Sequence, residues 1–210
     1  MCALSETKLM GKCEVVGRVS GVAVGRAREG VALLLSERLM CVVEWKEVSS
    51  RHMWVRVKIE RESWVFISAY GPGSEKSEVE IEEFWNELRE CVGSFVRNES
   101  VVVLGDLNAR VGNEVIEGIV QRHGVPGRNE SGERLLKMCA EQQLVVGNSW
   151  FKKNVYKYAW LRMAEGRVVD KALMDYVLLP RRMLGRLLDV KVCRGEGGGD
   201  CLTIFWWKLG

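Results

Sequence analysis

Histidine is scarce in this sequence, which has only two, His52 and His123, in 210 residues. Paired cysteine motifs are missing as well, because the seven cysteines are scattered without any Cys-x-x-Cys pair and their number is odd. This pattern is typical of reduced thiols inside a cell. We therefore expect an intracellular protein, nuclear or cytoplasmic.

Long apolar runs are also missing. No stretch of about 18 consecutive apolar residues occurs, and the chain does not open with a basic stretch followed by an apolar one. Both absences argue against secretion and against a membrane as partner. A large excess of charge of one sign is missing too. The 31 basic and 28 acidic side chains leave a formal net charge of +3, which permits nucleic-acid binding without requiring it.

The sequence does contain enough apolar material for one large core. Hydrophobic residues make up 47% of the chain, so we expect residues 1–210 to form a single α/β domain. Its first half is rich in β-branched and aromatic residues, which predicts strands over residues 30–35, 40–48, 53–60 and 64–70. In the third strand Arg56 and Lys58 interrupt the apolar positions, which favours an antiparallel meander with one solvent-facing side.

The apolar period changes to helical spacing after Ser77. Ser77 and Glu80 have the spacing of a capping box, so we expect a helix from there to about residue 95. A second helix is predicted over residues 129–142. Between the helices, Ser100–Leu104 is a continuous apolar run that ends in Gly105 and Asp106, which is typical of a central strand buried on both faces. Further strands are predicted over residues 144–146, 156–161, 174–179, 187–192 and 202–207.

This order of elements predicts an α/β (α+β) fold built as a four-layer sandwich. Two mixed β-sheets would pack face to face, and the helices would lie on the outside. The carboxyl end of the central strand should then be a functional edge.

Oxygen-bearing side chains gather beside turn residues at the ends of the predicted strands. They occur in five segments, which are residues 5–8, 68–72, 105–109, 174–176 and 199–201. Hydrolysis of a phosphodiester needs a hard cation, a group that orients the attacking water, and donors for the developing negative charge. Carboxylates and amides collected at strand ends suit that chemistry.

In this order and at roughly this spacing, the five segments resemble those of the endonuclease/exonuclease/phosphatase superfamily. That superfamily includes abasic-site DNA repair endonucleases and the endonuclease domains of non-LTR retrotransposons. From Tyr70 to Arg194 the chain is most similar to the retrotransposon-like craniofacial development protein 2 family. The phrases that carry this closer similarity include SAYGPGSEKSE, VVVLGDLNARVGNE, GVPGRNESGERLLKMC and MDYVLLP.

The resemblance implies a metal ligand and a pair of residues that act on the phosphate. Glu6 would be the metal ligand, and a carboxylate is a ligand that Mg²⁺ or Mn²⁺ prefers. Asp106 would orient the nucleophile or serve the leaving group, while Asn108 would donate to phosphate oxygens. A plainer interpretation of the pair is an Asx turn that closes a strand.

The resemblance also implies catalytic roles for three further residues, with DNA as the substrate. Tyr70 would contact the scissile phosphate, although a lone tyrosine at a strand end usually packs with its hydroxyl in water. Asp175 matches the aspartate that orients a catalytic histidine. Asp200 matches the aspartate of the closing Ser-Asp-His motif.

The sequence departs from the family pattern at two places. Cys201 stands where the closing motif has histidine, and a neutral thiol is a weak donor. Neither His52 nor His123 falls at a matching position, and both are expected to face solvent. The family also opens with a strand that precedes the segment of Glu6, so we expect the fold to lack its first strand and to leave neighbouring backbone groups unpaired unless something else covers them.

These observations favour a Mg²⁺-dependent phosphodiester hydrolase of DNA-endonuclease and retroelement type, impaired by loss of the catalytic histidine. The alternative is a catalytically inactive relative, a pseudoenzyme that binds nucleic acid or protein. A lipid or inositol phosphatase is a third hypothesis, which the lack of an apolar membrane-engaging loop disfavours.

Overall fold

The computed structural model describes residues 2–5, 22–26, 31–35, 42–152, 160–164, 167–194 and 201–207. The strands in these ranges are β1 (Cys2–Ser5), β2 (Val22–Arg26), β3 (Val31–Leu35), β4 (Val42–Glu47), β5 (His52–Ile59), β6 (Glu62–Ala69), β7 (Ser100–Asp106), β8 (Leu144–Val146), β9 (Trp160–Ala164), β10 (Arg167–Ala172), β11 (Asp175–Pro180), β12 (Leu187–Arg194) and β13 (Cys201–Trp207). The helices are α1 (Glu78–Phe95), α2 (Glu130–Gln142) and the 3-10 helices η2 (Gly147–Trp150) and η3 (Arg181–Arg186).

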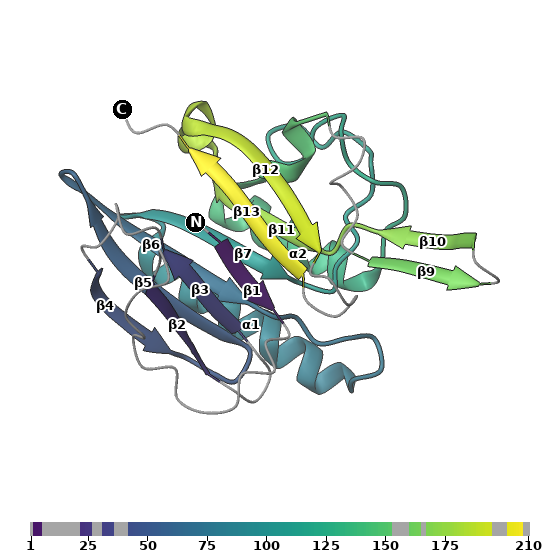
Figure 1. The fold of residues 1–210 in the computed structure, drawn as a ribbon, viewed down its shortest axis with the longest axis horizontal. Helices are drawn as coiled ribbons and strands as arrows, with labels where there is room; N and C mark the ends of the chain where they lie inside the picture. Colours follow the sequence, from purple (N-terminus) through teal and green to yellow (C-terminus); the bar gives the residue numbers. More distant parts are fainter. Residues whose placement is uncertain are drawn as a thin grey trace.

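These strands form two large sheets and a separate hairpin (Figure 1). The six-stranded sheet has the order β4-β5-β6-β7-β11-β8 and is mixed, because β6 and β7 are parallel and its other neighbours are antiparallel. The five-stranded sheet has the order β12-β13-β1-β3-β2 and is antiparallel in every described pair, so the prediction of two mixed sheets holds for one of them. Strands β9 and β10 pair with each other and project from the body.

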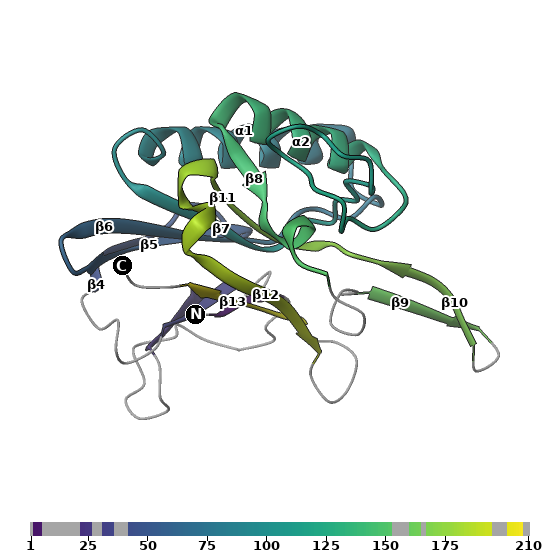
Figure 2. The same cartoon turned by 90° about the horizontal axis from the view of Figure 1, so that it is seen from above.

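Figure 2 shows the layers from the side: α1 and α2 cover one face of the six-stranded sheet, and the five-stranded sheet lies against its other face. The predicted face-to-face sheets and the outer helices are therefore present. Both α-helices of the described ranges lie on the same side, so these ranges contain three layers of the predicted four.

Strand β7 is buried on both faces, as its apolar run predicts. Val101 and Val103 point to the core under the helices, whereas Val102 and Leu104 point to the core between the sheets. All four are at most 1% exposed. The alternation places successive residues on opposite faces, and this makes β7 the shared wall of both cores.

Helix α1 begins at the predicted capping box. The Ser77 hydroxyl accepts a hydrogen bond from the Glu80 backbone N–H at 3.3 Å, and the Glu80 carboxylate accepts one from the Ser77 N–H at 3.1 Å. The apolar stripe of the helix faces the sheet, with Phe84, Trp85 and Leu88 buried. Local hydrogen bonding and amphipathic spacing are thus sufficient to define this helix.

The solvent-facing side predicted for β5 is only partly exposed. Lys58 is exposed as expected, but Trp54 on the same side is 7% exposed because Phe95 of α1 packs on it, with ring centroids 5.0 Å apart. Arg56 is half-buried and its guanidinium binds the Glu99 carboxylate. The helix therefore covers a face that alternation alone would leave to water.

Strand β1 is paired on both sides, with β13 and with β3, so the described backbone of this strand is not left without partners. Strands β1, β2 and β10 were not predicted. The strand predicted over residues 156–161 overlaps β9 at its last two residues, and residues 153–159 lie outside the described ranges. None of the helices that the structure describes combines the length and apolar character needed to cross a membrane.

Candidate active site

Two of the predicted carboxylates lie directly opposite each other at one end of the six-stranded sheet. Asp106 ends β7, Asp175 begins β11, and the two residues are partners in the antiparallel register. Opposite residues of an antiparallel pair project from the same face. Leu104 and Val177, two positions along each strand, lie in the core between the sheets. Both aspartates therefore belong to the face that looks toward the five-stranded sheet.

Tyr70 follows β6 at the same edge. It is half-exposed and packs against the core between the sheets. The guanidinium of Arg51 lies 5.7 Å from its ring centroid and donates a hydrogen bond of 3.5 Å to its carbonyl oxygen. The next residue, Gly71, donates from its N–H to the Asp106 carbonyl at 2.8 Å. The tyrosine thus has a packing role and also lies beside Asp106.

Asp106 and Asn108 form an Asx turn, the plainer of the two interpretations of this pair. The Asp106 Oδ1 accepts a hydrogen bond of 2.8 Å from the Asn108 N–H, and the Asn108 Nδ2 donates one of 2.8 Å to the Gly71 carbonyl. Asn108 has φ of 46°, in the left-handed region that asparagine tolerates. The turn holds both side chains, which remain half-exposed.

Two glycines allow the strand ends to approach closely. At Gly105, where φ is 134°, an added Cβ would lie 2.1 Å from the Ala69 carbonyl oxygen. At Gly71 an added Cβ would lie 2.4 Å from the Leu107 carbonyl oxygen. A side chain at either position would push the ends of β6 and β7 apart, so these glycines set the spacing of the candidate site.

Asn129 supports the turn and was not predicted as part of the site, although it was predicted to start the second helix. Its Oδ1 accepts hydrogen bonds of 2.8 Å from the N–H groups of Arg110 and Gly132, the second of which is the cap of α2. Its Nδ2 donates to the Asn108 carbonyl at 3.2 Å. One side chain therefore ties the helix start to the turn that carries Asn108.

Asp175 is 1% exposed, and its strand is held by a second unpredicted asparagine. Asn148 donates from Nδ2 to the Asp175 carbonyl at 3.1 Å and accepts at Oδ1 from the Val177 N–H at 2.8 Å. The neighbouring Tyr176 hydroxyl donates to the Leu173 and Ala109 carbonyls at 2.9 and 3.1 Å. Burial raises the pKa of Tyr176 well above its usual value, so the phenol remains a neutral donor.

The other predicted site residues are only partly covered by the structure. Glu6 and Asp200 lie outside the described residues. The residues next to them, Ser5 and Cys201, lie opposite each other in the pairing of β1 with β13. The side chain of Cys201 is not among those described.

The expectation that both histidines face solvent is wrong for His52. It is 0% exposed, its Nδ1 lies 2.9 Å from the Ser49 hydroxyl oxygen, and Phe84 of α1 packs edge-on against it. Its neighbour Met53 points to the core between the sheets, so His52 lies on the helix side of β5, away from the face of Asp106. His123 is half-buried.

The donor set of the described site fits a hard divalent cation. It offers two carboxylates, Asp106 and Asp175, and the amide of Asn108, all of them oxygen-bearing groups that Mg²⁺ or Mn²⁺ prefers. No group of three acidic, histidine or cysteine side chains suited to a metal occurs in the described ranges. Magnesium is commonly held by one or two carboxylates together with water.

The fold matches solved nucleases and phosphatases. One is the endonuclease domain of TRAS1, a telomere-specific non-LTR retrotransposon, with a TM-score of 0.60 and 11% identity over 88% of this chain and 78% of that one. Another is the 3′ phosphatase NExo from Neisseria bound to a product DNA hairpin, with a TM-score of 0.61 and 14% identity over 89% and 79% of the two chains. These are endonuclease/exonuclease/phosphatase folds, which agrees with the resemblance read from the sequence.

Sequence similarity leads to a particular relative. The chain is 28% identical to craniofacial development protein 2 of Bos taurus and 27% identical to that of Tragulus javanicus, over 176 residues in each case. The matches cover 83% of this chain but only 29% and 30% of the relatives, so the chain spans less than a third of their length. No family model matches. Both comparisons agree with the resemblance that the sequence motifs carry.

Proposed function

We propose that this chain is a metal-dependent phosphodiester hydrolase domain of the DNA-endonuclease and retroelement type, with catalysis impaired at Cys201. The observation that carries the proposal is the register that sets Asp175 opposite Asp106, with Tyr70 and Asn108 at the same sheet edge. The matched structures include a retrotransposon endonuclease and a phosphatase bound to DNA, which supports DNA as the partner.

Each described residue has a defined task under this proposal. Asp106, held by the Asn108 N–H, would orient the attacking water or accept its proton. Asn108 and Tyr70 would donate to phosphate oxygens, and Arg51, stacked on Tyr70, would bring positive charge to the same edge. A Mg²⁺ or Mn²⁺ ion bound by Glu6 with the site aspartates would supply neutralisation of the phosphate charge.

The alternative function is a catalytically inactive relative that binds nucleic acid or protein. One observation favours it over an efficient enzyme. Asp175 matches the aspartate that orients an imidazole, yet His52 lies on the opposite face of the sheet and Cys201 stands in the matching motif. Loss of general acid or base assistance lowers rates by about 10² to 10⁴-fold, so we expect slow hydrolysis at best.

Plasmid nicking with Mg²⁺ tests the proposal. We expect negligible nicking by the unmodified chain. We expect more nicking after Cys201→His or after insertion of histidine between Asp200 and Cys201, and loss of that gain when Asp106→Ala is added. If the unmodified chain nicks DNA and still does so after Asp106→Ala, the assignment of the site is wrong. If neither histidine variant nicks DNA but both bind it, the result supports the inactive alternative.

A further inference from the structure

The two edges of the six-stranded sheet differ in exposure. Strand β8, at one edge, is buried along its whole length and contacts α2. Strand β4, at the other edge, has four exposed central residues between half-buried ends. Within the part of the chain that the structure describes, β5 is the only strand paired with β4. An edge strand of this kind presents a row of backbone N–H and C=O groups to another chain.

The exposed side chains at this edge are unusually apolar. Six large hydrophobic residues are exposed in the described ranges, and three of them lie in β4 or directly after it. These are Val43, Trp45 and Val48, at 61%, 54% and 40% exposure. Trp45 lies opposite Val55, which is fully buried in the core between the two sheets. The side chain of Trp45 therefore projects from the same face of the six-stranded sheet, but at an exposed edge. Apolar side chains gathered on one exposed edge indicate an interaction surface.

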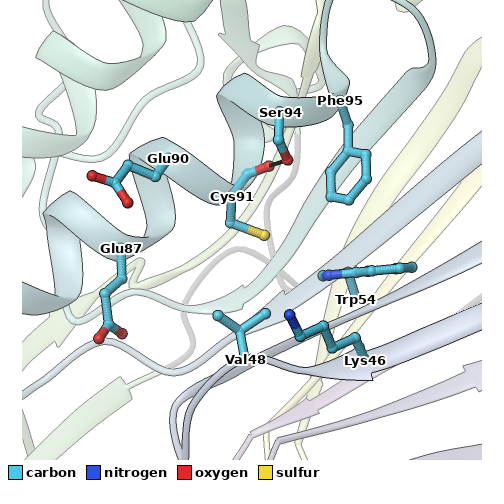
Figure 3. Close-up of a pocket in the computed structure, with 8 residues that line it drawn as sticks. All are labelled: Lys46, Val48, Trp54, Glu87, Glu90, Cys91, Ser94 and Phe95. Atoms are coloured by element: carbon cyan, nitrogen blue, oxygen red, sulfur yellow. Dashed lines mark hydrogen bonds between the residues drawn. The ribbon is translucent and has the colours of Figure 1, made fainter.

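Glu44 and Lys46, the neighbours of Trp45 in β4, carry opposite charges and project from the opposite face of the sheet. Glu44 binds Arg56 of β5, and Lys46 lies opposite Trp54. Figure 3 shows the ammonium of Lys46 pointing into a cavity of about 320 Å³ between β4 and α1. Glutamates of α1 line the other side of this cavity, while Val48 and Lys46 form its strand side. The order Glu44-Trp45-Lys46 is therefore complementary in charge to its own reverse.

We infer that β4 pairs antiparallel with the β4 strand of a second copy of this chain, centred on Trp45. In this register Trp45 faces the partner's Trp45. Glu44 faces the partner's Lys46, and Lys46 faces the partner's Glu44. A two-fold axis makes each contact twice. Cross-strand aromatic pairs and opposite-charge pairs stabilise such a ladder, and like charges directly opposite destabilise it.

The charges select this register over its neighbours. Centring the pair on Lys46 would set two ammonium groups opposite each other, and centring it on Glu44 would do the same with two carboxylates. The bulge between Val42 and Glu44 ends the regular ladder on one side. The paired stretch is therefore short, and the dimer is concentration-dependent. This pairing is independent of the nuclease function proposed above.

Sedimentation equilibrium of the 210-residue chain under reducing conditions tests the inference. We expect the mean mass to rise with concentration from 23.8 kDa toward twice that value. Glu44→Lys and Lys46→Glu should each weaken association by about tenfold, because each replaces two attractive pairs by two repulsive ones. The double swap should restore it, since it exchanges the two charges. Trp45→Lys should abolish association.

The matched control is Val115→Lys, which places the same charge at a residue that is 56% exposed and lies outside β4. It should associate like the unmodified chain, and far-ultraviolet circular dichroism shows whether each variant is folded. Hydrogen exchange gives a second measurement, because the amides of β4 should become protected as concentration rises. A monomer at every concentration, or a dimer that survives Trp45→Lys, would refute the inference. If Glu44→Lys and Lys46→Glu are folded and weaken association, but the double variant does not restore it, the proposed register is wrong.

Discussion

Replacing Asn129 by alanine removes three side-chain hydrogen bonds at once. Its Oδ1 caps α2 through the Gly132 N–H, accepts from the Arg110 N–H, and its Nδ2 donates to the Asn108 carbonyl. Loss of an asparagine cap costs about 1 kcal/mol, and each further hydrogen bond contributes about 1 kcal/mol net. We therefore expect Asn129→Ala to lower the free energy of unfolding by about 3 kcal/mol.

Ser77→Ala is the matched control, because Ser77 caps α1 in the same way but lies at an exposed helix start away from the candidate site. It should cost about 1 kcal/mol. Urea denaturation followed by circular dichroism measures both, and a loss of 3 kcal/mol moves the midpoint by about 1.5 M when the slope is about 2 kcal/mol per M. Asn129→Ser retains an oxygen acceptor and should lie between the two. If Asn129→Ala costs no more than Ser77→Ala, the bonds to the turn of Asn108 carry no net energy and this account of the site is wrong.

Three further predictions concern packing, pH and metal binding. Gly132→Ala should destabilise the chain by several kcal/mol in the same assay, although alanine favours helices, because the added Cβ would lie 1.8 Å from the Arg110 carbonyl oxygen. The control is Gly185→Ala, whose Cβ would have nothing within 4 Å, and this variant should be neutral or slightly stabilising. Burial lowers the pKa of His52 to about 4 from 6.5, so as pH falls the unfolded chain takes up the proton first. The contribution of His52 to the free energy of unfolding should be constant above about pH 6.5 and fall by up to about 3 kcal/mol between there and pH 4. His52→Gln should remove this loss. An unchanged pH profile in that variant would contradict the burial argument. Calorimetric titration should detect weak Mg²⁺ binding that Glu6→Gln reduces, and equal binding by both proteins would place the metal elsewhere.

Short-range patterns in the sequence were enough to predict most of the central elements. The apolar run of Ser100–Leu104 predicted a strand buried on both faces, and β7 is that strand. The spacing of Ser77 and Glu80 predicted the start of α1. An Asx turn was the plainer interpretation of Asp106 and Asn108, and the pair does form this turn at the end of β7, whereas the catalytic roles that the resemblance implies for the two residues stay a prediction. These features depend on side-chain alternation and on hydrogen bonds between residues only two or three positions apart.

The resemblance named Asp106 and Asp175 as residues of one site, but only the tertiary structure decided how they are placed in it and which residues support them. The register that sets Asp175 opposite Asp106 joins strands almost seventy residues apart in the chain, and the supporting asparagines, Asn129 and Asn148, act through contacts that no local spacing reveals. The burial of His52 has the same origin, because a polar residue at the start of a strand is covered only when a helix from elsewhere packs over it. The alternation of apolar and polar residues predicts that the two faces of a strand differ, but the packing of other elements decides which face is exposed to water.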